Sequence, residues 1–227
     1  MLGPQASRLQ APQARAEVLR AATAKADPMS LPRNDAERSE LLPKTPGQIW
    51  LNRVRIWLPP LFVLVGLVWR QPSWNLWGLP LILLGEALRT WAAGCLIKDE
   101  TLTVGGPYAH LRNPLYLGSL LSGLGFLIVM GDWWLALVFL SVSLAIYVPT
   151  VKHEQDYLRR MYGEAYDAYC AAVPALLPQL LPARFDNPAM RQSRFDWNWV
   201  VLNKEHKTWT GLVVLFLLLW LRSALAG

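Results

Sequence analysis

Charged residues, cysteines and histidines are few in this sequence. Only 17% of its 227 residues are charged and 53% are hydrophobic, so the chain is more apolar than a typical soluble domain. Its two cysteines, Cys95 and Cys170, are too few for a disulfide framework and lack the spacing of metal ligands. The three histidines are scattered and form no metal-ligand pattern either. We therefore expect no metal site and no disulfide scaffold.

The net charge of +6 does not indicate a nucleic-acid-binding protein. The basic residues lie in the polar segments between apolar blocks, and they form no dense patch with interleaved aromatic residues. Residues 1–50 are polar and contain no continuous apolar stretch, which argues against a signal peptide. We expect this N-terminal tail to be disordered or to lie at the membrane interface, and residues 51–227 to form the folded domain.

Five apolar blocks dominate residues 51–227, and each approaches the length needed to cross a hydrocarbon core of about 30 Å. Several of the twelve tryptophans stand at block ends, where an amphipathic ring suits the headgroup layer. The pattern predicts an all-α, polytopic membrane helical bundle of about five transmembrane helices, with a cytoplasmic helix and loops. The predicted spans are residues 54–69, 74–97, 115–130, 133–150 and 209–222.

Local features refine these spans. Pro59 and Pro60 predict that the first helix is kinked or starts late. Only Gly131 and Asp132 separate the third block from the fourth. The third and fourth spans should therefore form a tight antiparallel hairpin.

The basic residues also predict the orientation. Nearly all of them lie in the N-terminal tail and in segments 98–114 and 151–208, whereas the opposite side has only Arg70 and Arg222. By the positive-inside rule, the N-terminus and both segments should be cytoplasmic, and the C-terminus should lie outside. We expect an integral protein of a bacterial inner membrane, with its chemistry on the cytoplasmic side.

The cytoplasmic segment 151–208 should contain a helix of its own. Apolar residues recur at helical spacing from Glu154 to Tyr169, and Gly163 interrupts them. Four prolines follow and argue against another long helix. The mixture of charged and aromatic residues over 191–208 suits a segment lying in the membrane interface.

Three polar features could carry chemistry. Residues 105–118 suit either a membrane re-entry turn or a binding loop followed by a helix start. The hairpin should bring Glu154 near Arg112, where its carboxylate could pair with this arginine or accept hydrogen bonds from a polar ligand. Glu86 and Arg89, three residues apart within the second span, could form a structural ion pair or line a substrate pocket.

Two motifs beside the hairpin resemble a known family. Segments 106–108 and 112–118 read Gly-Pro-Tyr and Arg-Asn-Pro-Leu-Tyr-Leu-Gly. They resemble the signature of the isoprenylcysteine carboxyl methyltransferase family and its phospholipid methyltransferase relatives. Glu154, with the Tyr-Gly-Glu-Ala-Tyr stretch at 162–166, is similar to the family's downstream motif. The resemblance covers residues 85–180, and the order of the two motifs makes it specific.

The resemblance implies a membrane-embedded methyltransferase that moves a methyl group from S-adenosylmethionine to a lipophilic acceptor, either a prenylcysteine-like carboxylate or another lipid. It places the cofactor within residues 98–180. The cofactor-binding residues that it implies are Thr101, Leu102, Tyr108, Asn113, Pro114, Leu115, Tyr116 and Glu154. The residues that we expect to contact the substrate are Glu86, Arg89, Arg112 and Lys152. No catalytic side chain is identified, because a sulfonium methyl group is already activated and chiefly needs alignment with the acceptor.

Three positions depart from the family's pattern. Asn113 replaces a histidine, and Gln155 replaces the second of two glutamates. Thr150 stands where the prenylcysteine enzymes have an arginine, with Lys152 nearby. The missing arginine weakens the case for a prenylcysteine carboxylate as the acceptor and leaves the cofactor prediction in place.

Other functions fit parts of the pattern. The acceptor could be a phospholipid amine, which would make the protein a phospholipid N-methyltransferase. Related folds include membrane reductases that use NADPH, although the sequence contains no clear dinucleotide site. A membrane scaffold or transporter subunit is a non-enzymatic alternative, and the sequence offers no internal repeat to support it. The oligomeric state is not indicated.

Overall fold

The computed structural model describes residues 46–69, 72–97, 102–186, 190–191 and 194–225. Within them the fold is all-α, as predicted, apart from two short strands. The helices are α3 (Pro46–Trp69), α4 (Gly78–Cys95), the 3-10 helix η2 (Gly106–Ala109), α5 (Pro114–Met130), α6 (Trp133–Tyr162), α7 (Glu164–Ala172), α8 (Trp197–Leu202) and α9 (Glu205–Ala224). The strands β1 (Leu102–Thr103) and β2 (Met190–Arg191) pair in parallel. The predicted tail, residues 1–50, lies almost wholly outside the described residues.

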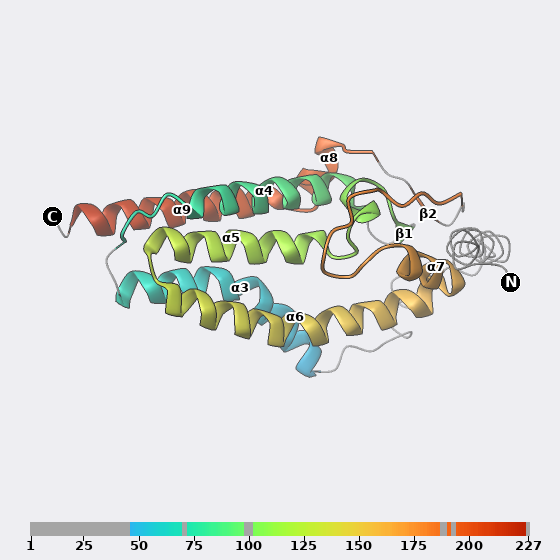
Figure 1. Ribbon diagram of the computed structural model, residues 1–227, viewed down its shortest axis with the longest axis horizontal. Helices are drawn as coiled ribbons and strands as arrows, with labels where there is room; N and C mark the ends of the chain where they lie inside the picture. Colours follow the sequence, from blue (N-terminus) through green and yellow to red (C-terminus); the bar gives the residue numbers. More distant parts are fainter. Residues whose placement is uncertain (1–45, 70–71, 98–101, 187–189, 192–193, 226–227) are drawn as a thin grey trace, which may run out of the picture.

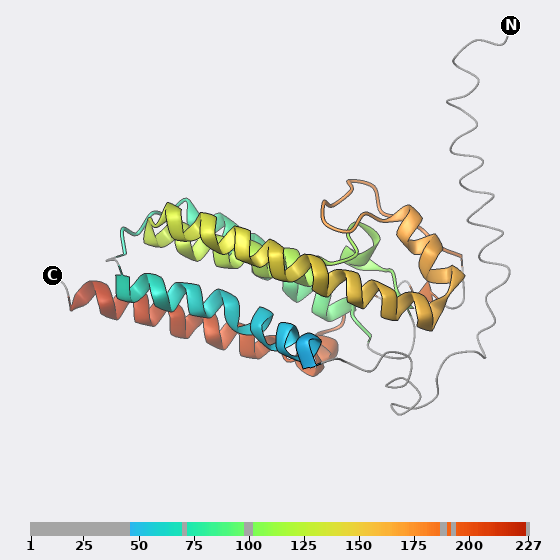
Figure 2. The same cartoon turned by 90° about the horizontal axis from the view of Figure 1, so that it is seen from below.

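The five longest helices form an elongated bundle. Figure 1 shows α3, α4, α5, α6 and α9 running along the longest axis, with η2, α7 and the two strands gathered at one end. Figure 2 shows α3 beside α9, with α5 and α6 in the neighbouring layer. Buried side chains from all five helices fill the space between them, including Val63, Ile82, Leu127, Phe139 and Leu219.

The outer face of the bundle is apolar. α6 and α9 are long and apolar enough to cross a membrane, and Trp57–Trp69 and Pro114–Met130 are shorter apolar helices. Exposed apolar side chains stand on the outer faces of these helices and of α4, among them Val68, Leu83, Trp134 and Leu217. Because water-soluble monomers rarely expose large contiguous apolar patches, this surface suits contact with lipid tails.

Of the predicted spans, 115–130 agrees best with the structure, since α5 begins one residue earlier and ends at the same place. α4 begins at Gly78 rather than at residue 74, and α9 begins at Glu205 rather than at residue 209. α6 does not end at residue 150 but continues to Tyr162. The polar residues that follow its apolar block, such as Lys, Glu and Gln, are good helix formers and extend the helix beyond the hydrocarbon.

Pro59 and Pro60 predict that the first helix is kinked or starts late, and the late start is wrong. α3 begins at Pro46 and continues through Pro59 and Pro60. A proline removes one backbone donor, and in membrane bundles neighbouring helices compensate for that loss. α3 packs against α5, α6 and α9, with Val63 and Leu67 in the core, so tertiary packing maintains the helix across the prolines.

The tight hairpin between the third and fourth spans is confirmed. Gly131 ends α5 in the left-handed conformation, with φ of +75°, and its N–H donates to the Ile128 carbonyl at 2.9 Å. Asp132 then caps α6, because its Oδ1 accepts from the Leu135 N–H at 3.0 Å. The chain therefore reverses within two residues, and α5 and α6 are antiparallel neighbours (Figure 1).

The predicted break at Gly163 is also confirmed. The helical pattern from Glu154 to Tyr169 belongs to two helices, the end of α6 and most of α7, which meet at this glycine. Gly163 has φ of +52° and ψ of −128°, a conformation that L side chains rarely adopt. The turn sends α7 back toward η2, where Tyr169 Oη donates to the Tyr108 carbonyl at 2.8 Å.

Candidate functional site

A cavity of about 300 Å³ lies at the end of the bundle where η2, α6 and α7 meet. One wall is formed by Leu96 and Ile97 after α4, by β1, by η2 and by the start of α5, and the other by α6 and α7. Seven of the eight residues expected to bind the cofactor line it, namely Leu102, Tyr108, Asn113, Pro114, Leu115, Tyr116 and Glu154. Thr101 lies outside the described residues. The two motif segments thus share one cavity, and the cofactor-binding role of these residues stays a prediction.

The expected approach of Glu154 to the start of α5 is confirmed. Tyr116 Oη donates a hydrogen bond to Glu154 Oε2 at 3.0 Å. The Tyr116 ring packs edge-on against Tyr147 of α6, with ring centroids 5.1 Å apart. Arg112 does not pair with Glu154, because the Nη1 of Arg112 donates to Cys170 Sγ at 2.6 Å instead. The pairing of Glu154 with Arg112 that the sequence suggests is therefore wrong.

The position of Arg112 leaves its charge available to the cavity. Its Nε is buried and has no hydrogen-bond partner among the described residues, and the same residues provide no carboxylate partner for the guanidinium. A buried donor without an acceptor is costly, and the cost is larger for a charged group. An anionic ligand group in the cavity would relieve that cost at Arg112.

The short helix η2 holds Tyr108 at the cavity wall. Gly106 has φ of +58°, and a Cβ at this position would lie 3.2 Å from Nε1 of Trp91, so the turn requires glycine. Pro107 then begins the helix, where its missing N–H costs nothing. The bond from Tyr169 Oη to the Tyr108 carbonyl fixes α7 against this turn.

Three tyrosines of the cavity, Tyr108, Tyr166 and Tyr169, are neutral hydrogen-bond donors at physiological pH. Burial raises the pKa of Tyr108 well above its ordinary value of 10.0, and the neighbouring Tyr169 and Glu154 raise it further. Burial likewise raises the pKa of Tyr169 and of Tyr166. These side chains therefore offer aromatic faces and O–H groups, and no phenolate base.

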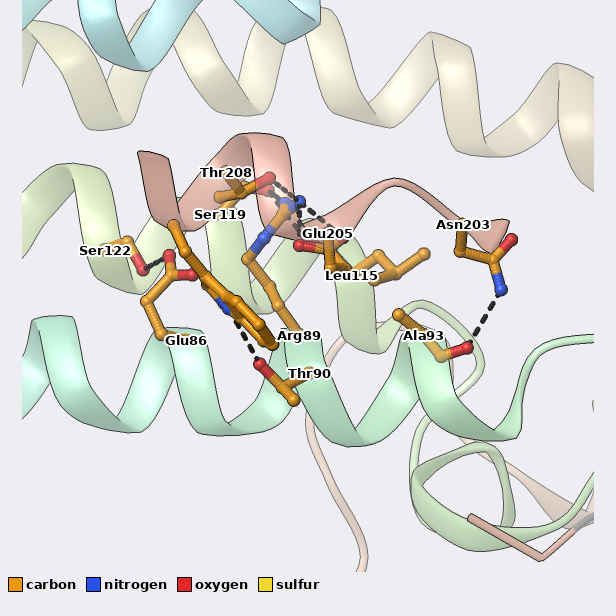
Figure 3. A network of polar contacts seen from close by, with 11 residues as sticks. Glu86, Arg89, Thr90, Ala93, Leu115, Ser119, Ser122, Asn203, Glu205 and Thr208 are labelled. Atoms are coloured by element: carbon orange, nitrogen blue, oxygen red, sulfur yellow. Dashed lines mark hydrogen bonds and ion pairs between the residues drawn. The ribbon is translucent and has the colours of Figure 1, made fainter. Parts of the chain in front are cut away.

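A second polar centre lies between α4, α5 and α9 (Figure 3). Of the two alternatives for Glu86 and Arg89, an ion pair or a pocket wall, the ion pair between them does not form. Arg89 instead pairs with Glu205 of α9, with 2.8 Å between Nη2 and Oε1, and it also donates to the hydroxyls of Ser119 and Thr208. The helix α9 supplies the carboxylate, so the burial of Arg89 is compensated across helices rather than within α4.

This second centre is separate from the cavity. The side chains of Arg89 and Glu205 are only 17% and 7% exposed, and Glu86 Oε1 accepts from Ser122 Oγ at 2.8 Å. Glu86 and Arg89 are not cavity-lining residues, and neither is Lys152, whose side chain is exposed on α6. Of the four expected substrate residues, the structure brings only Arg112 to the cavity.

Sequence reasoning alone does not identify several residues at these two places. Glu205 precedes the predicted fifth span, so nothing in the sequence points to it as the partner of Arg89. The cavity also contains Tyr157, Leu158, Met161, Tyr162, Tyr166 and Tyr169. Their spacing could have identified Leu158 and Tyr162, because they follow Glu154 at intervals of four residues and so lie on the same face of α6. In the described part of the chain, no three His, Cys, Asp or Glu side chains gather as metal ligands would.

Residues 74–165 match the phospholipid methyltransferase family. The chain is similar to protein-S-isoprenylcysteine O-methyltransferase of Schizosaccharomyces pombe, with 32% identity over 85 residues, 37% of this chain and 36% of that protein. For protein-S-isoprenylcysteine O-methyltransferase B of Arabidopsis thaliana, the identity is 31% over 113 residues, 44% and 57% of the two chains. For the cobalt-zinc-cadmium resistance protein CzcN of Cupriavidus metallidurans, it is 30% over 141 residues, 57% and 65% of the two chains. No solved structure matches the chain.

The chain spans less than two thirds of the length of each of these relatives. The family match nevertheless includes all of α4, α5 and α6, together with Tyr108, Tyr116 and Glu154 at the cavity. The resemblance that the two motifs suggest is thereby confirmed. Over residues 74–165, the chain therefore resembles the family of isoprenylcysteine carboxyl methyltransferases and phospholipid methyltransferases.

Proposed function

We propose that this protein is a membrane methyltransferase that uses S-adenosylmethionine to methylate a lipophilic acceptor. The observation that carries the proposal is the cavity in which the two motif segments meet, with Tyr116 and Glu154 joined at 3.0 Å. The names of two relatives, both O-methyltransferases of isoprenylcysteine, support the same reaction class. The cavity lies beside the apolar bundle, so an acceptor dissolved in the bilayer has a short path to it.

The side chains of the cavity fit this cofactor by their chemistry. The faces of Tyr108 and Tyr116 suit a sulfonium cation. The Glu154 carboxylate suits an ammonium group, and the unpaired Nε of Arg112 suits a carboxylate. A volume of about 300 Å³ is at the small end of the range for ligand sites.

When bound, S-adenosylmethionine would supply a methyl group whose carbon a lone pair of the acceptor attacks in line, while the electron pair of the carbon–sulfur bond goes to sulfur and S-adenosylhomocysteine leaves. The chain's own task is to bind and orient, which is where most of the rate gain for such a displacement arises. The hydrogen bond between Tyr116 and Glu154 holds both side chains at the wall.

Proton chemistry favours an acceptor that is already a nucleophile. The neutral tyrosines cannot take a proton, and among the described lining residues Glu154 is the single carboxylate. A carboxylate acceptor needs no base at all, whereas an ammonium acceptor must first lose a proton, for which Glu154 is the available group.

Cofactor binding and product identification test the proposal together. Protein purified in detergent should bind S-adenosylmethionine or S-adenosylhomocysteine in isothermal titration calorimetry. Incubation with labelled S-adenosylmethionine and a total membrane extract should place the label on a lipid-soluble molecule. Absence of binding at high micromolar ligand concentration would contradict the proposed function.

A phospholipid amine is the second candidate acceptor, favoured by the match of residues 74–165 to the phospholipid methyltransferase family and by Thr150 at the position of the prenylcysteine enzymes' arginine. Lipid extracts from cells with and without the gene should be compared by mass spectrometry. Methylated headgroups that depend on the gene would select this acceptor. We also propose, from the basic residues, that the cavity faces the cytoplasm of a bacterial cell.

A further inference from the structure

The loop between α7 and β2 presents four leucines to its surroundings. Residues 176–182 read Leu-Leu-Pro-Gln-Leu-Leu-Pro, so the Leu-Leu-Pro unit occurs twice in seven residues. Leu177, Leu180 and Leu181 are 80%, 96% and 80% exposed, and Leu176 is 47% exposed. Single exposed leucines are ordinary, but four in six residues form an apolar patch that water does not favour. We call residues 174–183 the leucine loop.

The backbone of the leucine loop is bonded to η2, which leaves the leucines on the outside. The Gln179 N–H donates to the His110 carbonyl at 3.0 Å, and the Gln179 side-chain amide donates to the Ala109 carbonyl at 3.0 Å. The Gln179 carbonyl lies 2.8 Å from His110 Nδ1, which therefore carries the hydrogen. The Ala183 N–H also donates to the Ala109 carbonyl at 3.0 Å. The exposure of the leucines thus belongs to an anchored conformation.

The composition of the loop lowers the cost of entering an apolar layer. Pro174, Pro178 and Pro182 have no backbone N–H, and the N–H groups of Gln179 and Ala183 are already bonded to η2. A segment that leaves water must satisfy its backbone donors within the protein. The leucine loop meets this requirement at five of its ten residues.

The leucine loop lies level with the start of α5. The Arg112 N–H donates to the Pro174 carbonyl, and Asn113 Nδ2 donates to the Ala175 carbonyl, both at 2.9 Å. Figures 1 and 2 show the loop, in orange, beside the first turns of α5 along the long axis. α5 has 17 residues, so it spans about 25 Å from this level to its other end. This level is therefore where the bundle leaves the hydrocarbon core.

We propose that the leucine loop inserts its leucines into the headgroup layer of the bilayer, on the leaflet next to the cavity. Interfacial segments of this kind bury their apolar side chains about 5–10 Å into the boundary between headgroups and acyl chains. Because Arg112 and Asn113 both line the cavity and hold the loop, insertion fixes the cavity wall at the lipid surface. The inference depends on the membrane bundle and is independent of methyl transfer.

Collision of a spin label with oxygen and with a nickel chelate tests the insertion. Oxygen concentrates in lipid and the chelate stays in water. A nitroxide is attached to Leu177→Cys or Leu180→Cys, in a Cys95→Ala/Cys170→Ser background, and the full chain is reconstituted in phospholipid nanodiscs. These two positions lie in different Leu-Leu-Pro units, so each checks the other, and both are exposed, so the melting temperature should match that of the background.

Two labelled positions serve as references. Glu164→Cys on α7 is exposed and polar, and it reports water, whereas Leu217→Cys is exposed on the apolar helix α9 and reports lipid. The ratio of oxygen to nickel collisions at both loop positions should lie between these references. A ratio equal to that of Glu164→Cys would overturn the proposal. A label shielded from both reagents would overturn it as well, since it would indicate that protein covers the loop.

Discussion

Arg89 and Arg112 are both partly buried arginines, and their surroundings give them different uses. Both leave Nε without a hydrogen-bond partner in the described structure. The charge of Arg89 is neutralised by Glu205, whereas Arg112 donates to Cys170 Sγ and has no carboxylate partner among the described residues. The difference between the two is therefore the presence of a carboxylate, and Arg112 is the one that lines the cavity.

The partners of an ionisable residue in an apolar bundle indicate whether its role is structural or functional. A buried charge that the protein itself neutralises contributes to assembly, and removing one partner leaves an uncompensated charge. A buried charge beside a cavity without such a partner is available to a ligand. By this criterion we infer that the centre at Arg89 is structural, and we propose that the centre at Arg112 and Glu154 is functional.

The largest effect is expected from breaking the structural pair. Arg89→Met leaves Glu205 buried without its counter-charge and should lower the free energy of unfolding by about 3–5 kcal/mol. Denaturant unfolding in detergent, followed by circular dichroism, measures the loss. The control is Arg89→Met/Glu205→Met, which removes both charges and should recover most of the stability. A single variant as stable as the parent would show that the pair is not structural.

The second effect concerns the cavity. Glu154→Gln removes one charge-assisted hydrogen bond of about 1.5–3 kcal/mol and should weaken binding of S-adenosylhomocysteine about 10-fold to 100-fold. Its melting temperature should stay within a degree or two of the parent's, since Glu154 is exposed. Glu164→Gln, an exposed carboxylate on α7, is the matched control and should bind normally. Unchanged affinity in Glu154→Gln would mean that the site is misplaced.

A third variant tests the packing of α5, the helix that contributes side chains to both centres. A Cβ at Gly85 would lie 2.6 Å from the Gly118 carbonyl oxygen, so Gly85→Ala forces α4 and α5 apart. The overpacking should cost about 1–3 kcal/mol of unfolding free energy. The control is Gly211→Ala on α9, where a Cβ meets nothing within 4 Å. Equal melting temperatures for the two variants would contradict the close contact.

The smallest effect is a pH dependence at the cavity. Since burial raises the folded pKa of Tyr169, its neutral form stabilises the fold below the ordinary pKa of 10.0, and this stability is lost as the pH rises further. Tyr169→Phe removes the bond to the Tyr108 carbonyl, should cost about 1 kcal/mol, and should flatten the alkaline loss of stability. Melting temperatures of the parent and of Tyr169→Phe from about pH 7 to pH 11 measure the cost in stability and the flattening of its alkaline decline. A decline as steep as that of the parent would exclude Tyr169 as its source.

Features encoded by neighbouring residues were predictable from the sequence. The hairpin follows from Gly131 and Asp132, and the break between α6 and α7 follows from Gly163, because each depends on local backbone conformation and capping. The start of α3 was not predictable from Pro59 and Pro60. α3 packs against three other helices, and local propensity does not report that packing.

The same distinction applies to the site. Glu154 meets Tyr116 because a two-residue turn returns the chain, which the sequence shows. The partner of Arg89 lies 116 residues away on α9, so the local spacing rule points to Glu86 instead. The long-range pair requires knowledge of helix packing, and the family resemblance gives no information on it.

The glycine between α6 and α7 has a consequence for the width of the cavity. Glu154 stands on α6 and Tyr166 on α7, and Gly163 is the single residue that separates the two helices. A side chain at Gly163 would find open space, since nothing lies within 4 Å of an added Cβ. What excludes other residues is the pair of backbone torsions. The backbone torsions of Gly163 therefore set the distance between Glu154 on α6 and Tyr166 on α7, and with it the width of the cavity.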